Sequence, residues 1–402
     1  MDAAVHLLRT LVSIDSVNPS LVPGAAGEGA IADAVARHLR AIGLDVEVQD
    51  AAPGRPNVIG VLEGRARGRS LMLCGHLDTV GVDGMRAPFD PVERDGRLYG
   101  RGACDMKAGI AAAVYAAEAL RRAGIELPGT LEVSGTVDEE SGGLAGVQWL
   151  AERRWLAKDK TDFVIIPEPL DVDRVCIGHR GVYWFEVEAH GRIGHGSMPF
   201  LGASAIEGMG RFLHLVEDEL KPRLAARRTD VPVVPPGARH ATINTNGIDG
   251  GQPIDGVQTP CVADRCRAVF DRRFLLEEGL EATRDEIAAL VDQARRLLPD
   301  IRFEVHDRLI VHPTRTPDDS PIIPALTGAI RTVLGREATL VASPGTYDHK
   351  HVARVAGVPH CVAYGPGELV LAHQPDEYCS VPDLVAATKV IALASLELMS
   401  ER

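Results

Sequence analysis

Apolar and polar positions along the chain follow two alternating patterns. Short apolar runs, typical of buried strands, alternate with longer stretches that carry apolar residues at every third or fourth position, typical of helices. In the first part of the chain the short runs predict strands at 46–48, 58–62, 71–75, 130–137 and 163–166, and the longer stretches predict helices at 28–42, 108–123 and 146–156. This alternation predicts an α/β fold built on one sheet.

Between residues 181 and 312 the order of the predicted elements changes. Strands are predicted at 182–189, 242–247, 265–274 and 301–305, and helices at 204–220 and 280–298. In chain order these elements read βαββαβ, the arrangement of a ferredoxin-like α+β domain. The α/β pattern then resumes, with helices at 322–334 and 381–399 and a strand at 360–364. We therefore expect a discontinuous α/β domain, residues 1–180 and 313–402, interrupted by an inserted α+β domain, residues 181–312.

The composition of the chain indicates which kinds of partner and which cellular compartment to expect. The 402 residues are 45% hydrophobic and carry a net charge of -13, which argues against nucleic acid or an anionic membrane surface as the main partner. The opening segment lacks the basic start of a signal peptide, and no stretch is long and apolar enough to span a bilayer. Seven scattered cysteines form no CxxC pair. These features predict a cytoplasmic protein with reduced thiols.

Polar residues follow or flank the predicted strands at several points. The segment Leu71–Asp78 runs from apolar residues into a histidine and an aspartate two positions apart, which would point the same way on a strand. Similar positions are held by Asp105, Glu139 with Glu140, Glu168 and His373. Each could be a solvated or capping residue by itself. Because ligands of open α/β sheets bind outside the carboxyl ends of the strands, we expect these side chains to converge.

Two histidines and at least three carboxylates suit a pair of divalent ions such as zinc, cobalt or manganese. In the simplest arrangement Asp105 bridges the two ions, while His76 and His373 each bind one ion together with another acid. Asp78 would then orient His76. One of the adjacent Glu139 and Glu140 could bind metal while the other acts as general base on a water molecule. This arrangement predicts hydrolysis.

Four motifs then resemble, in order and spacing, those of the M20 metallopeptidase family, and the resemblance covers nearly the whole chain. They are Gly-His-Leu-Asp-Thr-Val at 75–80, Gly-Arg-Gly-Ala-Cys-Asp-Met-Lys at 100–107, Asp-Glu-Glu at 138–140 and Ala-His-Gln-Pro-Asp-Glu at 372–377. The family includes acetylornithine deacetylase, succinyl-diaminopimelate desuccinylase, aminoacylase and glutamate carboxypeptidase. The resemblance implies a zinc-peptidase-like α/β catalytic domain with a lid and dimerisation domain, and hence a homodimer.

The resemblance also implies roles for individual residues of the catalytic domain. The implied metal ligands are His76, Asp105, Glu140, Glu168 and His373, with Asp105 bridging two zinc, cobalt or manganese ions per subunit. Glu139 becomes the base that activates water and then protonates the leaving amine. A cis peptide bond after Asp105 is implied as well.

Within the inserted domain the resemblance implies substrate contacts. His195 matches a histidine that stabilises the oxyanion in the partner's active site. Substrate-holding positions of the family are matched by Arg180, Asn244 and Arg273. The forked guanidinium group of arginine suits a substrate carboxylate. A substrate-contacting turn of the family is matched by Gly345 and Thr346. The chain departs from the family pattern at 250–263, where an insertion replaces the usual segment. Residues 348–351 add basic groups, which we expect to be solvated surface charge.

The resulting prediction is a homodimeric, two-metal amidohydrolase that removes the acyl group from an N-acyl-L-amino acid. The motifs at 365–368 and 372–377 look most like the acetylornithine deacetylase branch. Desuccinylase, aminoacylase, and dipeptidase or carboxypeptidase activities are alternatives within the family. A metal-binding protein on a retired hydrolase scaffold is an alternative of another class, and an intact Glu139 argues against it. An aminopeptidase of related fold would lack the inserted domain.

Overall fold

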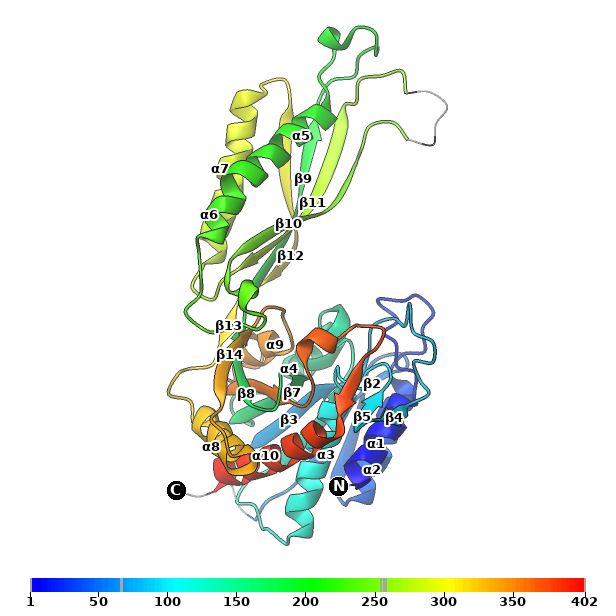
Figure 1. Cartoon of the computed structure of the whole chain (residues 1–402), viewed down its shortest axis with the longest axis vertical. Coiled ribbons are helices and arrows are strands. Elements are labelled where there is room, and N and C mark those ends of the chain that lie inside the picture. The colour runs from blue at the N-terminus through cyan, green and yellow to red at the C-terminus, as the bar shows by residue number, and fades with distance from the viewer. Residues whose placement is uncertain (1, 66–67, 254, 256–258, 401–402) are drawn as a thin grey trace. The chain divides into compact units, whose positions relative to one another are not determined.

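The computed structural model describes residues 2–65, 68–253, 255 and 259–400, and the chain divides into two units (Figure 1). The first unit comprises residues 1–178, 315–341 and 347–402, and the second comprises residues 179–314 and 342–346. The sequence assigned residues 342–346 to the catalytic domain, whereas their contacts group them with the second unit. Ala342 explains the difference, because its N–H donates to the carbonyl of Pro232 and it pairs with Val233.

A mixed nine-stranded sheet forms the centre of the first unit. Its strand order is β1-β2-β6-β3-β7-β15-β8-β13, and β14 pairs with β8. The strands are β1 (Asp45–Ala52), β2 (Arg55–Leu62), β3 (Leu71–His76), β6 (Leu131–Thr136), β7 (Phe163–Pro169), β8 (Arg174–His179), β13 (Thr314–Arg315), β14 (Thr339–Ser343) and β15 (Cys361–Gly365). The central run β6-β3-β7-β15 is parallel, while β1, β2 and β8 join antiparallel. This confirms the predicted α/β class.

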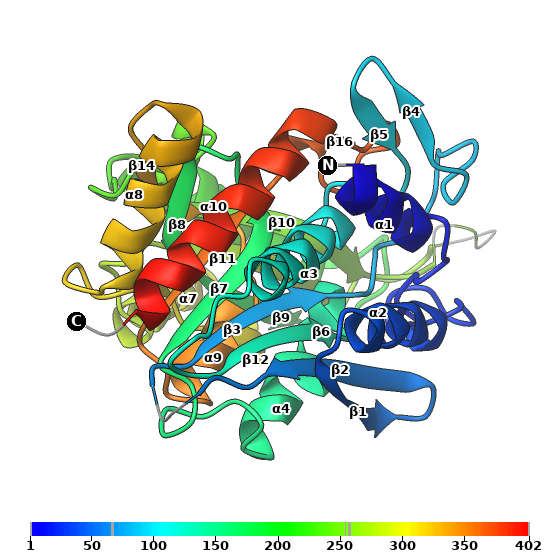
Figure 2. The ribbon, with the colours of Figure 1, turned by 90° about the horizontal axis from the view of Figure 1, so that it is seen from below.

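The parallel strands are buried on both faces, as their unbroken apolar runs predict. Every residue of β3, β7 and β15 is buried. Helices α3 (Lys107–Arg122) and α10 (Val381–Met399) pack against each other over one face of the sheet (Figure 2). The other helices of this unit are α1 (Asp2–Val12), α2 (Gly29–Ala41), α4 (Trp149–Glu152), α8 (Ile322–Leu334) and α9 (His349–Arg354). No helix among the described residues is long and apolar enough to cross a membrane.

Two features of the first unit differ from the prediction. A small antiparallel sheet of β4 (Val92–Arg94), β5 (Arg97–Tyr99) and β16 (Tyr378–Ser380) was not predicted, because its strands are only three residues long. The helix predicted at 146–156 is a π-turn, Leu144–Gln148, followed by the short α4. Gly146 causes this break, since its backbone is non-helical and a Cβ there would clash with the carbonyl of Val137.

The second unit has the predicted βαββαβ order. Its strands are β9 (Gly181–His190), β10 (Thr242–Gly250), β11 (Arg265–Phe274) and β12 (Arg302–Val311), and they form an antiparallel sheet of order β10-β11-β9-β12. Helices α5 (Ala205–Leu215), α6 (Lys221–Ala225) and α7 (Leu280–Leu297) cover one face (Figure 1). Side chains such as Phe185, Phe212, Phe270 and Phe303 fill the space between sheet and helices. The other face of the sheet carries mostly polar residues.

Candidate active site

His76 ends the buried strand β3 and is itself buried. Its Nδ1 lies 3.0 Å from the carbonyl oxygen of Asp78, so an Nδ1–H donates to that carbonyl. In the neutral ring this contact leaves Nε2, which lies 3.1 Å from Oδ1 of Asp105, as the nitrogen available to a metal ion. A histidine held in this way has its free nitrogen oriented for a metal ion, as the arrangement of metal-bound histidines requires.

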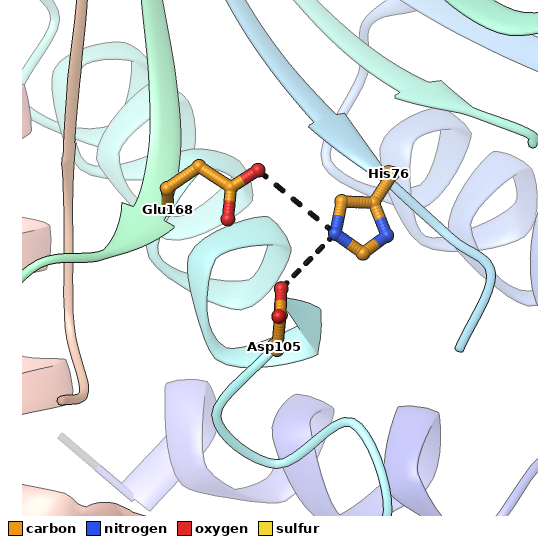
Figure 3. Close-up of side chains that lie close together, drawn as sticks. All are labelled: His76, Asp105 and Glu168. Atoms are coloured by element: carbon orange, nitrogen blue, oxygen red, sulfur yellow. Dashed lines mark hydrogen bonds and ion pairs between the residues drawn. The ribbon is translucent and has the colours of Figure 1, made fainter. Parts of the chain in front are cut away.

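Asp105 lies in the turn that leads into α3, and its carboxylate faces two histidines. Oδ1 approaches Nε2 of His76, and Oδ2 lies 3.5 Å from Nε2 of His373. Glu168, at the end of β7, places Oε1 4.0 Å from the same nitrogen of His76 (Figure 3). The peptide bond after Asp105 is cis, as the family resemblance implied.

A second group of ligand atoms surrounds the other oxygen of Asp105. His373 Nε2 lies 3.0 Å from Oε2 of Glu140. The His373 backbone adopts φ of 65°, a left-handed conformation that is uncommon outside glycine and often found at functional sites. Two groups, His76 with Asp105 and Glu168, and Asp105 with Glu140 and His373, could therefore each hold a metal ion, and Asp105 belongs to both.

The two adjacent glutamates occupy a short 3-10 turn, Glu139–Ser141, rather than an extended segment. Their backbone N–H groups both donate to the carboxylate of Asp78, at 3.1 Å each. From this turn the side chains diverge. Glu140 contacts His373, whereas Glu139 Oε1 lies 3.8 Å from Nζ of Lys350. Asp78 therefore positions His76 and both glutamates at once.

Burial and crowded charge perturb the titration of the group. Burial raises the pKa of Glu168 well above its ordinary value, with a further contribution from the charge of Asp105. Burial likewise raises the pKa of Glu140 to about 7. For His76, burial is outweighed by hydrogen bonds to Asp105 and Asp78, so its pKa lies well above the ordinary value. Hydrogen bonds to Asp105 and Glu140 raise the pKa of His373 to about 10. The carboxylates thus draw positive charge into the cluster.

The residues present fit a pair of divalent metal ions. Imidazole nitrogens and carboxylate oxygens are the donors that zinc, cobalt and manganese accept. Within the described residues Glu140 Oε1 is buried and has no hydrogen-bond partner, which leaves it available as a ligand atom. Two cations between these acids would also offset the mutual repulsion that, together with burial, raises the pKa values of Glu140 and Glu168.

Three residues that support this site were not identified from the sequence. Glu377 is buried and its Oε1 accepts hydrogen bonds from the N–H groups of Cys104, at 2.8 Å, and Asp105, at 3.0 Å. Asn18 donates to Asp78 at 2.7 Å. Lys350, expected as solvated charge, is only 8% exposed, and His349 beside it is also buried. Glu377 stands within the motif at 372–377, so its position could have been noticed, whereas Asn18 and Lys350 stand in no such motif.

His195 belongs to the second unit, in an exposed loop. The N–H of Ser197 donates to its Nδ1 at 3.1 Å. This contact makes Nδ1 the acceptor, so in the neutral ring Nε2 carries the hydrogen and is a hydrogen-bond donor. The tautomer matches the one that an oxyanion would need.

The other predicted substrate contacts also lie in the second unit. The guanidinium group of Arg180 donates to the carbonyl oxygens of Pro344 and His240, so several of its N–H groups are engaged within the second unit. Arg273 forms a two-pronged ion pair with Asp271. Asn244 is opposite Asp271 in the sheet and donates to Asn246. The N–H of Gly345, next to Thr346, donates to Ser343 Oγ in the same turn.

Comparison with known proteins identifies relatives along most of the chain. The model of peptidase family M20/M25/M40 matches residues 72–397. The chain is 31% identical to N-formyl-4-amino-5-aminomethyl-2-methylpyrimidine deformylase of Bacillus subtilis, with 96% of this chain and 92% of that protein covered. It is 29% identical to acetylornithine deacetylase of Photorhabdus laumondii, with 96% and 95% covered.

The fold has matches among solved structures as well. Aminopeptidase PepT from Bacillus cereus superimposes with a TM-score of 0.77 over 100% of this chain and 99% of that chain, at 21% identity. This match supports the α/β domain with an inserted α+β domain. It also shows that the expectation that an aminopeptidase of related fold would lack the inserted domain is wrong, because this aminopeptidase matches the whole chain. The family model and the identity to the deformylase are independent of this structural match. The chain therefore belongs to peptidase family M20/M25/M40, whose members hydrolyse amide bonds.

Proposed function

We propose that the protein hydrolyses the amide bond of a small N-acyl-L-amino acid, as acetylornithine deacetylase does, with two divalent metal ions bound per subunit. The observation that carries the proposal is the position of Asp105. One of its oxygens faces His76, the other faces His373, and a further acid lies on each side. Zinc is the metal we expect first, with cobalt or manganese as alternatives, because all three accept this mixed set of donors.

In this proposal His76, Asp105 and Glu168 hold one ion, and Asp105, Glu140 and His373 hold the other. Two such ions polarise a carbonyl and lower the pKa of water toward neutrality. Asp78 keeps Nε2 of His76 free by accepting the Nδ1 hydrogen through its backbone carbonyl. Its carboxylate fixes the turn that carries both glutamates.

Glu139 is the general base. It takes a proton from water as the water oxygen attacks the amide carbonyl carbon, and it returns that proton to the amine nitrogen as the C–N bond breaks. Burial raises the pKa of Glu139, while the charge of Lys350 opposes the rise. A carboxylate with a raised pKa accepts and returns a proton more readily near neutral pH than one with an ordinary pKa.

We further propose a homodimer in which His195 of one subunit serves the active site of the other. The Nε2–H left by the Ser197 contact suits a hydrogen bond to the oxyanion. The neighbouring loop exposes Ile193, Met198 and Phe200, and Phe200 is 77% exposed. Apolar side chains exposed together are typical of a surface that binds another protein.

We propose that residues of the second unit recognise the substrate carboxylate. Arg273 is partly exposed and Asn244 shares its sheet face two residue pairs away, so both can reach a bound carboxylate. Arg180 holds the turn of Gly345 and Thr346 through Pro344, and so contributes by positioning that turn. The location we propose is the cytoplasm, which the seven free cysteines favour.

Deformylation is a second candidate function. The deformylase of Bacillus subtilis matches nearly all of this chain at 31% identity, and the substrate in its name carries an N-formyl group on an aminomethylpyrimidine rather than on an amino acid. Both candidates use the same amide chemistry. They differ in whether the amine half of the substrate carries a carboxylate.

A substrate panel on one metal-analysed preparation tests these proposals. The panel contains N-acetyl-ornithine, N-succinyl-diaminopimelate, other N-acyl amino acids, dipeptides and the N-formyl pyrimidine, each with added zinc, cobalt or manganese. We expect the highest kcat/KM on an N-acyl amino acid. A preference for the pyrimidine would replace the first candidate by the second. No turnover on any member would favour a retired scaffold that only binds metal.

A further inference from the structure

The polar face of the sheet in the second unit carries a cluster that the proposed reaction does not use. On β9 and β12 alternate residues point away from the helices, because side chains of a strand alternate between faces. The cluster comprises Glu188 and His190 of β9, Glu304 and His306 of β12, and the arginines Arg265 of β11 and Arg302 of β12. Both strands lie in the second unit (Figure 1).

The two glutamates of the cluster occupy positions where their charges destabilise the sheet. Glu188 and Glu304 are directly opposite each other in the antiparallel pair of β9 and β12. Like charges in this position repel and destabilise a sheet. Glu188 is moreover only 7% exposed, so water screens its charge poorly. Positive charge close to the two carboxylates therefore stabilises this strand pair.

Two histidines approach the pair from the neighbouring positions on the strands. Nε2 of His190 lies 3.6 Å from Oε2 of Glu188 and 3.5 Å from Oε2 of Glu304. Nε2 of His306 lies 3.8 Å and 3.6 Å from the same two oxygens. All four distances exceed the usual length of an N–H···O hydrogen bond. Within the described residues the buried Nε2 of His190 has no hydrogen-bond partner.

The other oxygen of each glutamate is held by an arginine. Nε of Arg265 contacts Oε1 of Glu188, and Nη1 of Arg302 contacts Oε1 of Glu304. The arginines thus orient both carboxylates and leave both Oε2 atoms directed toward the imidazoles. This is the arrangement of metal sites, in which outer hydrogen bonds fix the ligating carboxylates.

We propose that Glu188, His190, Glu304 and His306 form a zinc site on this face, separate from the paired ions of the catalytic centre. Ligand atoms about 2.0–2.2 Å from a tetrahedral zinc ion lie about 3.3–3.6 Å apart, close to the four nitrogen–oxygen distances observed. Ligand atoms of Glu188, His190 and Glu304 all lie within 4.8 Å of one another. The ion links β12, an edge strand, to β9 and neutralises the opposed glutamates.

Metal content of the full-length protein tests this proposal. Wild type and the double variant His190→Gln/Glu304→Gln are equilibrated with the same micromolar free zinc, and bound zinc is measured by mass spectrometry. We expect the double variant to lose one zinc ion per chain and to keep its kcat/KM, because no residue of this cluster acts in the proposed reaction. His214→Gln is the matched control, since His214 is an exposed histidine of the same unit that pairs with Asp218.

Equal zinc content in wild type and double variant would overturn the proposal, as would an equal loss in the His214→Gln control. The four residues would then be an ion-pair network that holds no metal. Crystals of the wild type grown with zinc provide a second measurement that does not depend on folding of the variants. We expect anomalous diffraction at the zinc edge to give a peak between Glu188 and Glu304, and zinc-grown crystals without this peak would also overturn the proposal.

Discussion

The two units each gather histidines and carboxylates, but they do so in different ways. In the first unit the residues come from distant parts of the chain, at the ends of parallel strands or in turns beside them, and His76, Asp105 and Glu168 are buried. In the second unit they come from neighbouring positions on two antiparallel strands, and arginines hold the outer oxygens. In the first arrangement the ligand atoms face one shared carboxylate, as the proposed two-metal reaction requires. In the second arrangement the arginines already balance part of the negative charge of the glutamates, as expected for a site that holds a structural metal ion.

Asp105→Asn is expected to have the largest effect, because one carboxylate faces both ligand groups of the first unit. We expect loss of both catalytic ions and a fall in kcat/KM of about 10³-fold or more, since metal ions contribute several kcal/mol to transition-state stabilisation. Bound metal and kinetics are measured on the same sample. The zinc proposed for the second unit should remain, and loss of all metal would show that the two sites are not independent.

Glu139→Gln separates catalysis from metal binding within the first unit. We expect turnover to fall about 10²- to 10⁴-fold, the usual contribution of a general base, while the metal content stays at the wild-type value. Glu140→Gln is the matched comparison and should lower metal content. If Glu139→Gln were the variant that lost metal, the roles of the two glutamates would have to be exchanged.

His195→Ala tests whether the second unit takes part in the reaction. We expect kcat to fall about 10²- to 10³-fold, as for loss of one oxyanion donor, with the oligomeric state in size-exclusion chromatography unchanged. His190→Gln, in the same unit, should leave kcat unchanged. Near-normal turnover of His195→Ala would remove this histidine from the mechanism.

Glu377→Gln tests the support of the shared ligand. A glutamine retains an oxygen for the N–H groups of Cys104 and Asp105 but loses the charge that pairs with Arg101. We expect metal affinity to fall about 10- to 100-fold, as for other residues that orient ligands. Metal titration measures the effect, and Glu368→Gln, an exposed neighbour, should match wild type. An unchanged affinity would limit Glu377 to a role in folding.

Lys350→Met should have the smallest effect, a shift in pH dependence. Burial raises the pKa of Glu139, and the positive charge of Lys350 lowers it, so removing that charge raises the pKa further. Because the base works only when deprotonated, the acidic limb of kcat/KM should move to higher pH, by about one unit or less. Lys350→Arg and the exposed Lys389→Met are controls. A shift to lower pH would contradict this assignment.

Much of the fold follows from local sequence patterns. The apolar runs of β3, β7 and β15 and the periodicity of α8, α10 and α7 predicted those elements closely, because burial dictates residue type at these positions. The three-residue strands of the small sheet escaped notice, since so short a segment carries no period. The break at Gly146 depends on contact with Val137, a tertiary neighbour.

For the candidate site, the sequence by itself identified residues that the fold brings together, because His76, Asp105, Glu168 and His373 stand at the predicted strand ends or in the family motifs. Only the tertiary structure decided how they are supported. It brings Asn18 to Asp78, Glu377 to the backbone of Asp105 and Lys350 to Glu139. It also opposes Glu188 and Glu304 across two strands. Residue type sets what a side chain can do, whereas strand register and long-range packing set what it meets, and neither is encoded within a short stretch of sequence.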